Sequence, residues 1–433
     1  MFNLSQRKKW PLLLLSLIVF LVLLTAPAAA GNPETEKGSM PVLFFQSKTG
    51  QLKVWFMEQG SRVFSDVFAA VDPAWQVKAV VDSDGDGHAD IYFYNREEGR
   101  VKVWLMEGLT RVDKVEITNP ALHRNDIDPP WDMKGVGDLN DSGEPDIIWQ
   151  RDDGELAIWL MDNQEAVRTG RLFNKDPVYE DSKVNPMWQI GAITDLSGDG
   201  RPEILWQAVE GEFLDQLAYW NVNVAGADFY RSGSGRLTEG GKGRSIQAGW
   251  RMKEAVDLKG DGKPEILFQG IRGSLKGELA YWVMEAEERM GGSRLNPRNI
   301  GPQWDLVGAQ VMQATKEYHI YRPGYADLPG EVKAWKNDWI YRSLDHPTGQ
   351  TYEYNGQLYI LAAYGECMTT GYHVEITSLA EYNNNLVCIA HFTKPGPDDV
   401  VGMAITYPYD LIVLDNPGLP VQFGATGAET EIY

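Results

Sequence analysis

Four loops rich in Asp and Gly carry the side chains of this 433-residue chain that are best suited to chemistry. They read DSDGDGHAD (82–90), DLNDSGEPD (138–146), DLSGDGRPE (195–203) and DLKGDGKPE (257–265). Oxygen-bearing side chains at loop positions 1, 3, 5 and 9, with Gly at position 6 for a sharp turn, suit a hard cation that takes roughly six to eight oxygen ligands. The loops therefore predict structural Ca²⁺ sites that brace the turns between strands.

The four loops differ in the number of carboxylates that they offer to a cation. The candidate ligands are, loop by loop, Asp82, Asp84, Asp86 and Asp90; Asp138, Asn140, Ser142 and Asp146; Asp195, Ser197, Asp199 and Glu203; and Asp257, Asp261 and Glu265. We expect the first loop to bind Ca²⁺ best, whereas Lys259 at position 3 of the fourth loop would repel the ion or replace it. The alternative is that the loops are Asx-type turns that connect strands without a metal.

These loops belong to an internal repeat that each time begins with a tryptophan. The opening residues are Trp75, Trp131, Trp188, Trp250 and Trp304, at spacings of 56, 57, 62 and 54 residues. Each of the first four segments continues through its Asp/Gly loop into a pair of short strands, at 90–94 and 101–106, 146–150 and 156–161, 203–207 and 217–222, and 265–269 and 279–284. Runs of β-branched and aromatic residues bounded by turn residues are typical of strands. A third stretch, such as 111–118, would complete a four-stranded unit.

The two ends of the repeat region are complementary half-units. The chain enters at VLFFQ (42–46) and LKVWFM (52–57), which match the second half of a unit, and leaves at WDLVGA (304–309), which matches a first half. Joining the halves closes the array and leaves no open strand edge, as in β-propellers. We therefore expect an all-β protein with a five-bladed β-propeller over 41–310, closed by N- and C-terminal half-blades. The alternative is an open array of similar hairpins.

The loops that begin at Asp82, Asp195 and Asp257 resemble the calcium-loop consensus D-x-[DNS]-G-D-G-x-x-[DE] of the FG-GAP/VCBS repeat family. The resemblance spans about 42–310 and departs from the family pattern at Asp141-Ser142, at Lys259 and in the composite fifth blade, which has no such loop. It implies an extracellular β-propeller that is used for binding and does not imply catalysis.

A smaller β-rich domain is expected over 330–415, after a linker at 311–329 and before a tail at 416–433. Apolar residues at helical spacing predict a short helix from Glu331 to Leu344. Strand-like runs lie at 351–356, 357–365, 372–380, 385–392 and 410–414. Both cysteines of the chain, Cys367 and Cys388, fall in this domain, and the sequence leaves open whether they form a disulfide.

Two segments of this domain, GECMTTGYHVEI (365–376) and FTKPGPDDVVGMAITYPYDLIVL (392–414), resemble the C-terminal domain of the PrcB family of protease-complex subunits. Thr370 departs from the family pattern, which often has Gly there. The resemblance implies a module that associates with or stabilises an extracellular protease without catalysis. Its candidate partner-binding residues are Thr369, Gly371, Tyr372, Thr406, Pro408 and Tyr409. The alternative role of these residues is turn formation and packing.

The N-terminus has the features of an export signal. Three cationic residues at 7–9 precede an apolar run over 10–24 and an Ala-rich stretch that ends at Ala30. The run is short for a membrane-spanning helix, which needs about 20 apolar residues. We expect residues 1–30 to be a signal peptide and 31–40 a linker, with a secreted or cell-surface mature protein. An uncleaved membrane anchor is the alternative.

Composition narrows the function further. The chain has 61 acidic and 40 basic residues, and a net charge of −21 argues against non-specific nucleic-acid binding. The sequence contains no H-E-x-x-H, G-x-S-x-G or P-loop motif, so we expect no enzyme. The expected function is a scaffold whose propeller binds a partner or surface and whose C-terminal module binds an extracellular protease. The alternatives are a lectin-like propeller that binds polysaccharide and a hydrolase with an acidic site.

Overall fold

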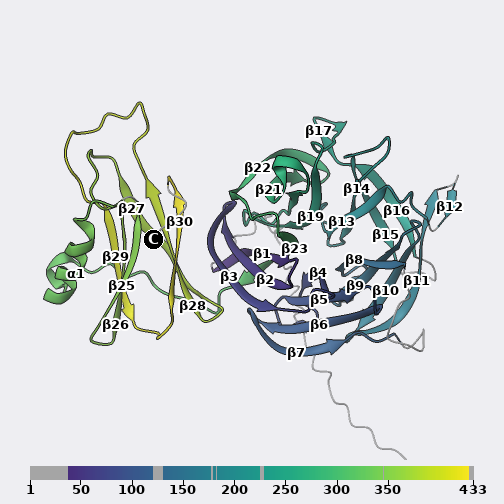
Figure 1. Cartoon of the computed structure of the whole chain (residues 1–433), viewed down its shortest axis with the longest axis horizontal. Helices are drawn as coiled ribbons and strands as arrows, with labels where there is room; N and C mark the ends of the chain where they lie inside the picture. Colours follow the sequence, from purple (N-terminus) through teal and green to yellow (C-terminus); the bar gives the residue numbers. More distant parts are fainter. Residues whose placement is uncertain are drawn as a thin grey trace, which may run out of the picture.

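The described part of the chain is almost entirely β-structure, as the sequence predicts (Figure 1). A computed structural model describes residues 38–119, 130–176, 179–181, 183–224, 229–344 and 346–428. The predicted signal peptide at 1–30 lies outside these residues. Within them, α1 (Gly330–Ile340) is the one α-helix, and no helix is long and apolar enough to cross a membrane.

The repeat region folds into four-stranded antiparallel units that follow the sequence repeat. Unit 1 contains β4 (Gln76–Val81), β5 (Asp90–Asn95), β6 (Arg100–Glu107) and β7 (Thr110–Glu116). Unit 2 contains β8 (Trp131–Gly137), β9 (Asp146–Arg151), β10 (Leu156–Asp162) and β11 (Glu165–Asp176). Unit 3 contains β13 (Trp188–Thr194), β14 (Glu203–Ala208), β15 (Leu217–Asn223) and β16 (Phe229–Arg236). Unit 4 contains β19 (Trp250–Val256), β20 (Glu265–Gly270), β21 (Glu278–Glu285) and β22 (Glu288–Asn299).

Four short elements are attached to these units. They are β12 (Tyr179–Asp181), β17 (Thr238–Glu239), β18 (Lys242–Gly243) and the 3₁₀ turn η2 (Gly273–Leu275). β12 pairs with β11, and β17 pairs with β18 and β22, so these elements extend the outer edges of units 2 and 4.

A further four-stranded unit is assembled from both ends of the region. β1 (Ser39–Ser47), β2 (Gln51–Glu58) and β3 (Ser61–Ala70) come from the N-terminal side of the repeats. β23 (Trp304–Gln313) joins them from the other side and pairs antiparallel with β1, with Leu43 opposite Ala309. The structure thus pairs the two half-units that the sequence identifies, and we call this set the composite unit.

The first strands of the units contact one another in a ring. β4 contacts β8, β8 contacts β13, β13 contacts β19, β19 contacts β23, and β23 returns to β4. At the periphery, short parallel pairings of β11 with β16 and of β22 with β3 merge neighbouring units into larger sheets. The units are therefore arranged around a common axis in a closed, barrel-like assembly (Figure 1).

A buried polar side chain near the end of each second strand crosses to the next unit. Gln207 of unit 3 donates from Nε2 to the Trp250 carbonyl at 2.9 Å and accepts at Oε1 from the Met252 amide at 2.8 Å. The same donation is made by Gln46 to Trp75 at 2.7 Å, by the Tyr94 hydroxyl to Trp131 at 3.0 Å, by Gln150 to Trp188 at 2.9 Å and by Gln269 to Trp304 at 2.8 Å. We call these contacts the seam hydrogen bonds, and together they join every neighbouring pair of the units described above.

Inside each unit, an aromatic ring of the second strand packs against a tryptophan of the third. The ring centroids lie 4.8–5.1 Å apart. The pairs are Phe45–Trp55, Phe93–Trp104, Trp149–Trp159, Trp206–Trp220 and Phe268–Trp282. The third-strand tryptophans are at most 8% exposed, so the repeat uses them to fill the core of each unit.

The C-terminal domain packs two small sheets and a helix. One sheet has the order β24 (Lys316–Glu317), β27 (His373–Tyr382), β28 (Asn385–Thr393) and β30 (Val421–Gly427). The other has the order β25 (Thr348–Tyr354), β26 (Gln357–Ala363) and β29 (Tyr409–Asp415). α1 covers the second sheet, where Val332 packs with Leu361 and Leu411. Cys367 and Cys388 are both buried and are free thiols.

Two strands of this domain lie where the sequence predicts a linker and a tail. β24 and the 3₁₀ turn η3 (Tyr325–Asp327) fall within 311–329, and β30 falls within 416–433. Gly424 and Gly427 weaken the strand signal of β30, which owes its conformation to parallel pairing with β28, a tertiary contact. β24 and β30 of this sheet therefore lie outside the predicted range of 330–415.

The C-terminal domain is docked against the ring through a shared core. Ala380, Val387 and Ile389 belong to the same buried cluster as residues of β1, β2, β5 and β6. The Tyr382 ring packs edge-on against Phe56 with centroids 5.8 Å apart, and its hydroxyl donates to the Gly38 carbonyl at 2.7 Å. The C-terminal domain and the ring consequently share one hydrophobic core at their contact.

We expect Gln207→Leu to lower the free energy of unfolding by about 2–4 kcal/mol, because it leaves the Trp250 carbonyl and the Met252 amide buried without partners. Gln51→Leu is the matched control, since Gln51 is exposed on β2, and we expect it to change stability by less than about 0.5 kcal/mol. Denaturant unfolding of both variants measures the difference. Equal stabilities would show that the seam hydrogen bonds do not hold the ring together.

Candidate functional site

All four Asp/Gly loops join the first strand of a unit to its second and so lie at the same end of the ring. In the loop at 82–90, the Asp82 carboxylate accepts hydrogen bonds from the Gly85 and Gly87 amides at 2.8 and 2.9 Å. Gly87 has φ +87°, which explains why glycine occupies loop position 6. Carboxylate oxygens of Asp82, Asp84 and Asp86 lie within 4.8 Å of one another. Such close like charges are stabilised by a cation between them, so this loop has the donors for Ca²⁺.

The loop at 195–203 forms a second cluster of three carboxylates. Oxygens of Asp195, Asp199 and Glu203 lie within 4.8 Å of one another. The Asp195 carboxylate accepts from the Gly198 amide at 2.7 Å, and the Ser197 hydroxyl donates to it at 3.4 Å. This loop therefore presents one buried and two more accessible carboxylates to a cation.

The other two loops form the same turns without a cluster of three carboxylates among the described residues. In loop 138–146 the Ser142 hydroxyl donates to the Glu144 carbonyl at 3.4 Å. In loop 257–265 the Lys259 ammonium lies 3.7 Å from the Glu265 carboxylate, beside a candidate ligand. The remaining candidates accept backbone amides within their loops; they are Asp138, Asn140, Asp257 and Asp261.

The carboxylate at loop position 9 is buried in every loop and joins the loop to the core. Asp146 accepts from the Leu139 amide of its loop and from the Met161 amide of the third strand, both at 3.0 Å. Asp90 makes the equivalent bonds to Ser83 and Met106 at 2.9 Å. Burial raises the pKa of all four side chains, and for Asp146 and Glu265 the pKa reaches about 7. The carboxylate at position 9 therefore serves mainly to hold the loop to the third strand. In loop 82–90 this residue, Asp90, is not part of the cluster of Asp82, Asp84 and Asp86.

Five of the six predicted partner-binding residues lie in two adjacent loops of the C-terminal domain, at 364–372 and 394–408, and Tyr409 is the first residue of β29 (Figure 1). The Thr406 hydroxyl donates to the Thr369 carbonyl at 2.9 Å, and the Cys367 and Thr406 backbones exchange two hydrogen bonds at 2.8 Å. Gly371 has φ +95°, and a Cβ there would lie 3.1 Å from Pro395. These residues hold the two loops together.

The other three predicted residues have different surroundings. Tyr372 packs edge-on against Tyr364, and the Pro408 carbonyl accepts from the Tyr364 amide at 3.0 Å. Tyr409 is 37% exposed, and the Lys336 ammonium lies 4.4 Å from its ring centroid. Of the six predicted residues, Tyr409 alone presents a large apolar surface to solvent.

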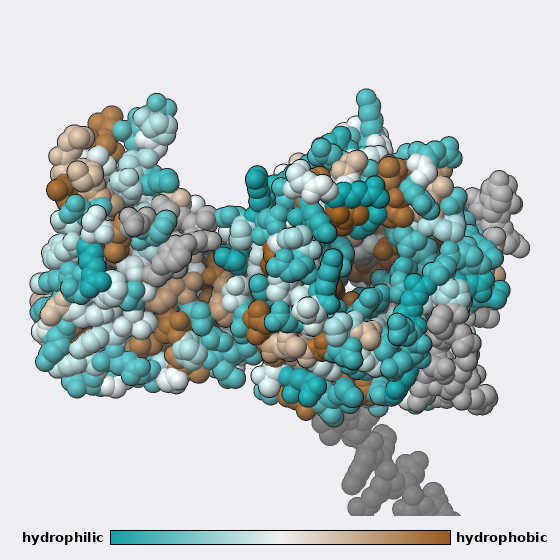
Figure 2. Space-filling view, viewed as in Figure 1, coloured by the Kyte–Doolittle hydropathy of each residue, from teal (hydrophilic) through white to brown (hydrophobic). Residues whose placement is uncertain are grey.

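An apolar surface that the sequence analysis missed lies on the same two loops. Met368, Val400, Met403 and Ile405 are 68%, 103%, 89% and 54% exposed. Figure 2 shows the brown patches of these protruding loops at the upper left of the molecule. We call these four side chains the apolar tip. The signal in the sequence is the apolar run VVGMAI, which falls between turn residues where no core strand is expected.

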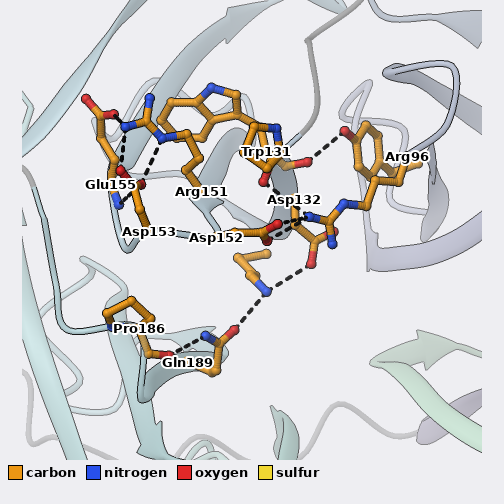
Figure 3. A network of polar contacts seen from close by, with 12 residues as sticks. Arg96, Trp131, Asp132, Arg151, Asp152, Asp153, Glu155, Pro186 and Gln189 are labelled. Carbon is orange, nitrogen blue, oxygen red and sulfur yellow. Dashed lines mark hydrogen bonds and ion pairs between the residues drawn. The ribbon is translucent and has the colours of Figure 1, made fainter.

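A second missed feature is a cavity of about 660 Å³ on the axis, lined by the beginnings of the first strands. It lies at the end of the ring opposite the Asp/Gly loops, which follow the ends of those strands. Asp132 accepts from Lys78 at 2.8 Å and from Lys134 at 2.9 Å, and Lys134 also donates to Gln189 at 2.9 Å. Figure 3 shows Asp132 and Gln189 within this network. The signal in the sequence is a lysine three residues after the opening tryptophan in three of the five segments.

Below this cavity the axis continues as a narrower space of about 200 Å³ that contains Glu254. Val80, Val136 and Ile193 line it, and the Glu254 carboxylate accepts only the Ala255 amide among the described residues, at 3.0 Å. Burial raises the pKa of Glu254 to about 8. The folded state therefore holds a proton on Glu254 that the unfolded chain releases above its ordinary pKa of 4.5.

We expect Glu254→Gln to raise the melting temperature more at pH 9 than at pH 5. The raised pKa means that the contribution of Glu254 to stability falls as pH rises from about 4.5 to about 8 and is constant above that. A neutral amide of the same shape removes this loss. Melting curves of both proteins across this range measure the effect, and a difference that does not change with pH would contradict the assignment.

Comparison with known proteins assigns part of the chain. The family model of the PrcB C-terminal domain matches residues 358–415, which include β26 to β29 and both loops of the apolar tip. The search among curated proteins found no match.

Similar solved structures include a putative 6-phosphogluconolactonase from Bacteroides uniformis, with 10% identity, 75% of this chain and 79% of that chain covered, and a TM-score of 0.28. A chain of a mitotic checkpoint complex has 12% identity, coverages of 73% and 90% and a TM-score of 0.28. A post-proline cleaving enzyme from Rickettsia typhi has 8% identity, coverages of 77% and 45% and a TM-score of 0.27. At such TM-scores these similarities carry no argument about fold or activity, so the PrcB C-terminal match is the informative one.

Proposed function

We propose that this protein is an exported, non-catalytic scaffold whose C-terminal domain binds an extracellular protease and whose repeat region is a five-bladed propeller of the FG-GAP/VCBS type. The observation that carries the proposal is the PrcB C-terminal match at 358–415, on a domain with an exposed apolar tip. The PrcB family consists of protease-complex subunits, so association with a protease is the function that this match favours.

The strand order supports the propeller. Each of units 1 to 4 and the composite unit has four antiparallel strands, and their first strands contact in a closed ring. The seam hydrogen bonds recur at equivalent positions, which is the regularity expected of blades around one axis.

The apolar tip supports a protein partner. Side chains such as Val400 and Met403 are almost fully exposed, although large apolar groups are normally removed from water. Apolar side chains of this kind form the centres of protein interfaces, where they are enclosed by a pocket of the partner. The hydrogen bonds between Thr369 and Thr406 and between Thr370 and Gly402 fix the two loops, so binding costs little conformational entropy.

Calcium fits the proposal as a structural ion of the propeller. Loops 82–90 and 195–203 each present three carboxylates, whereas the Lys259 ammonium already lies beside Glu265 in loop 257–265. Ca²⁺ in loops 82–90 and 195–203 would neutralise these carboxylates at the C-terminal ends of β4 and β13. Because Asp90 and Glu203 join the loops to the third strands, ion binding would stabilise the whole unit.

For the protease, we expect the double variant Val400→Asp/Met403→Asp to abolish association without changing the melting temperature, because both side chains are exposed in the free protein. The tagged protein is mixed with the culture supernatant of the organism that makes it, and recovered proteins are identified by mass spectrometry and assayed for proteolysis. Val112→Asp is the matched control, since Val112 is 58% exposed on β7 of the ring. Recovery of no protease by the unmodified protein would contradict the proposal, and so would equal recovery by the double variant.

For calcium, we expect millimolar Ca²⁺ to raise the melting temperature and Asp84→Asn to remove a large part of the shift, because the cluster at 82–90 loses one charge. Asp113→Asn, an exposed acid of β7 outside the loops, is the control and should retain the full shift. Calorimetric titration gives the stoichiometry. The absence of both heat and a melting shift would exclude calcium from the protein.

A further inference from the structure

The first strands of the units carry a second set of contacts across the seams, at the mouth of the axial cavity. Two residues matter in each strand, the one directly after the opening tryptophan and the one two positions later. Lys78 of unit 1 reaches Asp132 of unit 2 at 2.8 Å, and Lys253 of unit 4 reaches Asp305 of the composite unit at 2.6 Å. In each case the later residue of one strand pairs with the earlier residue of the next strand around the ring.

The seam between units 3 and 4 departs from this rule, as does the seam between the composite unit and unit 1, where the two residues are Val307 and Gln76. Between units 3 and 4 the earlier residue is Arg251, but the later residue of the preceding strand is Gly191, which has no side chain to meet it. A Cβ at Gly191 would lie 2.7–2.8 Å from atoms of Met252, so the packing of unit 4 keeps this position small. Arg251 forms no hydrogen bond or ion pair among the described residues. Burial lowers its pKa, although the nearby Asp215 carboxylate acts in the opposite direction.

The axial cavity that Arg251 lines is mainly cationic, whereas Asp215 lies on the other side of Arg251. Lys78, Lys134 and Lys253 line the same cavity from the other first strands, and Lys48 and Lys276 lie at its rim. Asp132 and Asp305 are the two carboxylates of the lining, so the cavity has four more cationic than anionic side chains in a chain whose net charge is −21. The Asp/Gly loops lie at the other ends of these strands. The length of β4 places its loop about 20 Å from the mouth of the cavity. At this distance the carboxylates of the loops weaken the positive electrostatic potential at the mouth only slightly, because the intervening salt solution screens them.

From these observations we propose that the mouth of the axial cavity binds a small organic anion, one oxyanion group of which is held by Arg251 over Gly191, between Lys134 and Lys253. A guanidinium presents a planar pair of donors that matches a carboxylate, sulfate or phosphate group. The cavity of about 660 Å³ is within the range of small-molecule sites. A small ligand is favoured over a polymer because the axis narrows below the mouth to a space lined by Val80, Val136 and Ile193. The site belongs to the ring and does not depend on association of the C-terminal domain with a protease.

The test is calorimetric titration of the full chain with sodium succinate and, separately, with sodium sulfate, in calcium-free buffer at constant ionic strength and with sodium chloride as the reference. Succinate probes a carboxylate ligand, and sulfate probes the sulfate and phosphate class. We expect at least one of them to bind with a stoichiometry of one, and Arg251→Gln to weaken that binding about tenfold or more, since a hydrogen bond to a charged group is lost. Because Arg251 forms no hydrogen bond or ion pair among the described residues and interacts with Asp215 only through the electrostatic field, this variant should melt at close to the same temperature as the unmodified protein without ligand.

Arg201→Gln is the matched control, since Arg201 is exposed in the loop at the opposite end of unit 3. It should bind the anion as the unmodified protein does. The proposal is overturned if neither anion binds more than chloride does, if Arg251→Gln binds as well as the unmodified protein, or if Arg201→Gln weakens binding equally. None of these outcomes depends on protease recovery, so this proposal and the proposed function fail separately.

Discussion

The hydrogen bonds across the seams are the interaction on which the rest of this structure depends. A sheet of four strands has two edges and two faces, and it is stable here only because its neighbours in the ring cover both faces. The amide of Gln207 satisfies the Trp250 carbonyl and the Met252 amide, two backbone groups at the start of the next first strand that ladder pairing does not reach. Without such a partner each group would be buried unsatisfied, so the polar side chain fixes the angle and spacing of successive units.

The same logic explains the acids at loop position 9. Asp90, Asp146, Glu203 and Glu265 are at most 1% exposed, and burial raises the pKa of each. Burying these carboxylates in charged form costs free energy. Their oxygens, however, accept hydrogen bonds from backbone amides that the Asp/Gly loop directs inward. A cation at the cluster of Asp82 would therefore act on a loop that is already joined to the third strand through Asp90. This is why we regard the cation as a stabiliser of an existing turn rather than its cause.

Much of this architecture can be predicted from the sequence, because the repeat makes each position visible several times. The tryptophan openers, the strand pairs and the pairing of residues 42–46 with 304–309 all follow from period and pattern. β30 could not be predicted, since its pairing with β28 is a tertiary contact and its glycines weaken the local strand signal. The environment of Arg251 also depends on tertiary structure. The sequence shows that Arg251 follows Trp250. That Gly191 lies beside it, at the same cavity, follows only from the arrangement of the units in the ring.

The C-terminal domain is docked at the seam where the ring closes. The composite unit is the one place where strands from distant parts of the chain complete the ring, and the domain contacts both sides of the seam that follows it. Tyr382 donates to the Gly38 carbonyl at the start of β1, while Asn383 accepts from the Leu109 amide of unit 1 at 2.9 Å. The domain therefore stabilises the closing seam, and the closed ring in turn fixes the domain. A protein that binds at the apolar tip, as we propose, would therefore meet a domain that is itself docked against the ring.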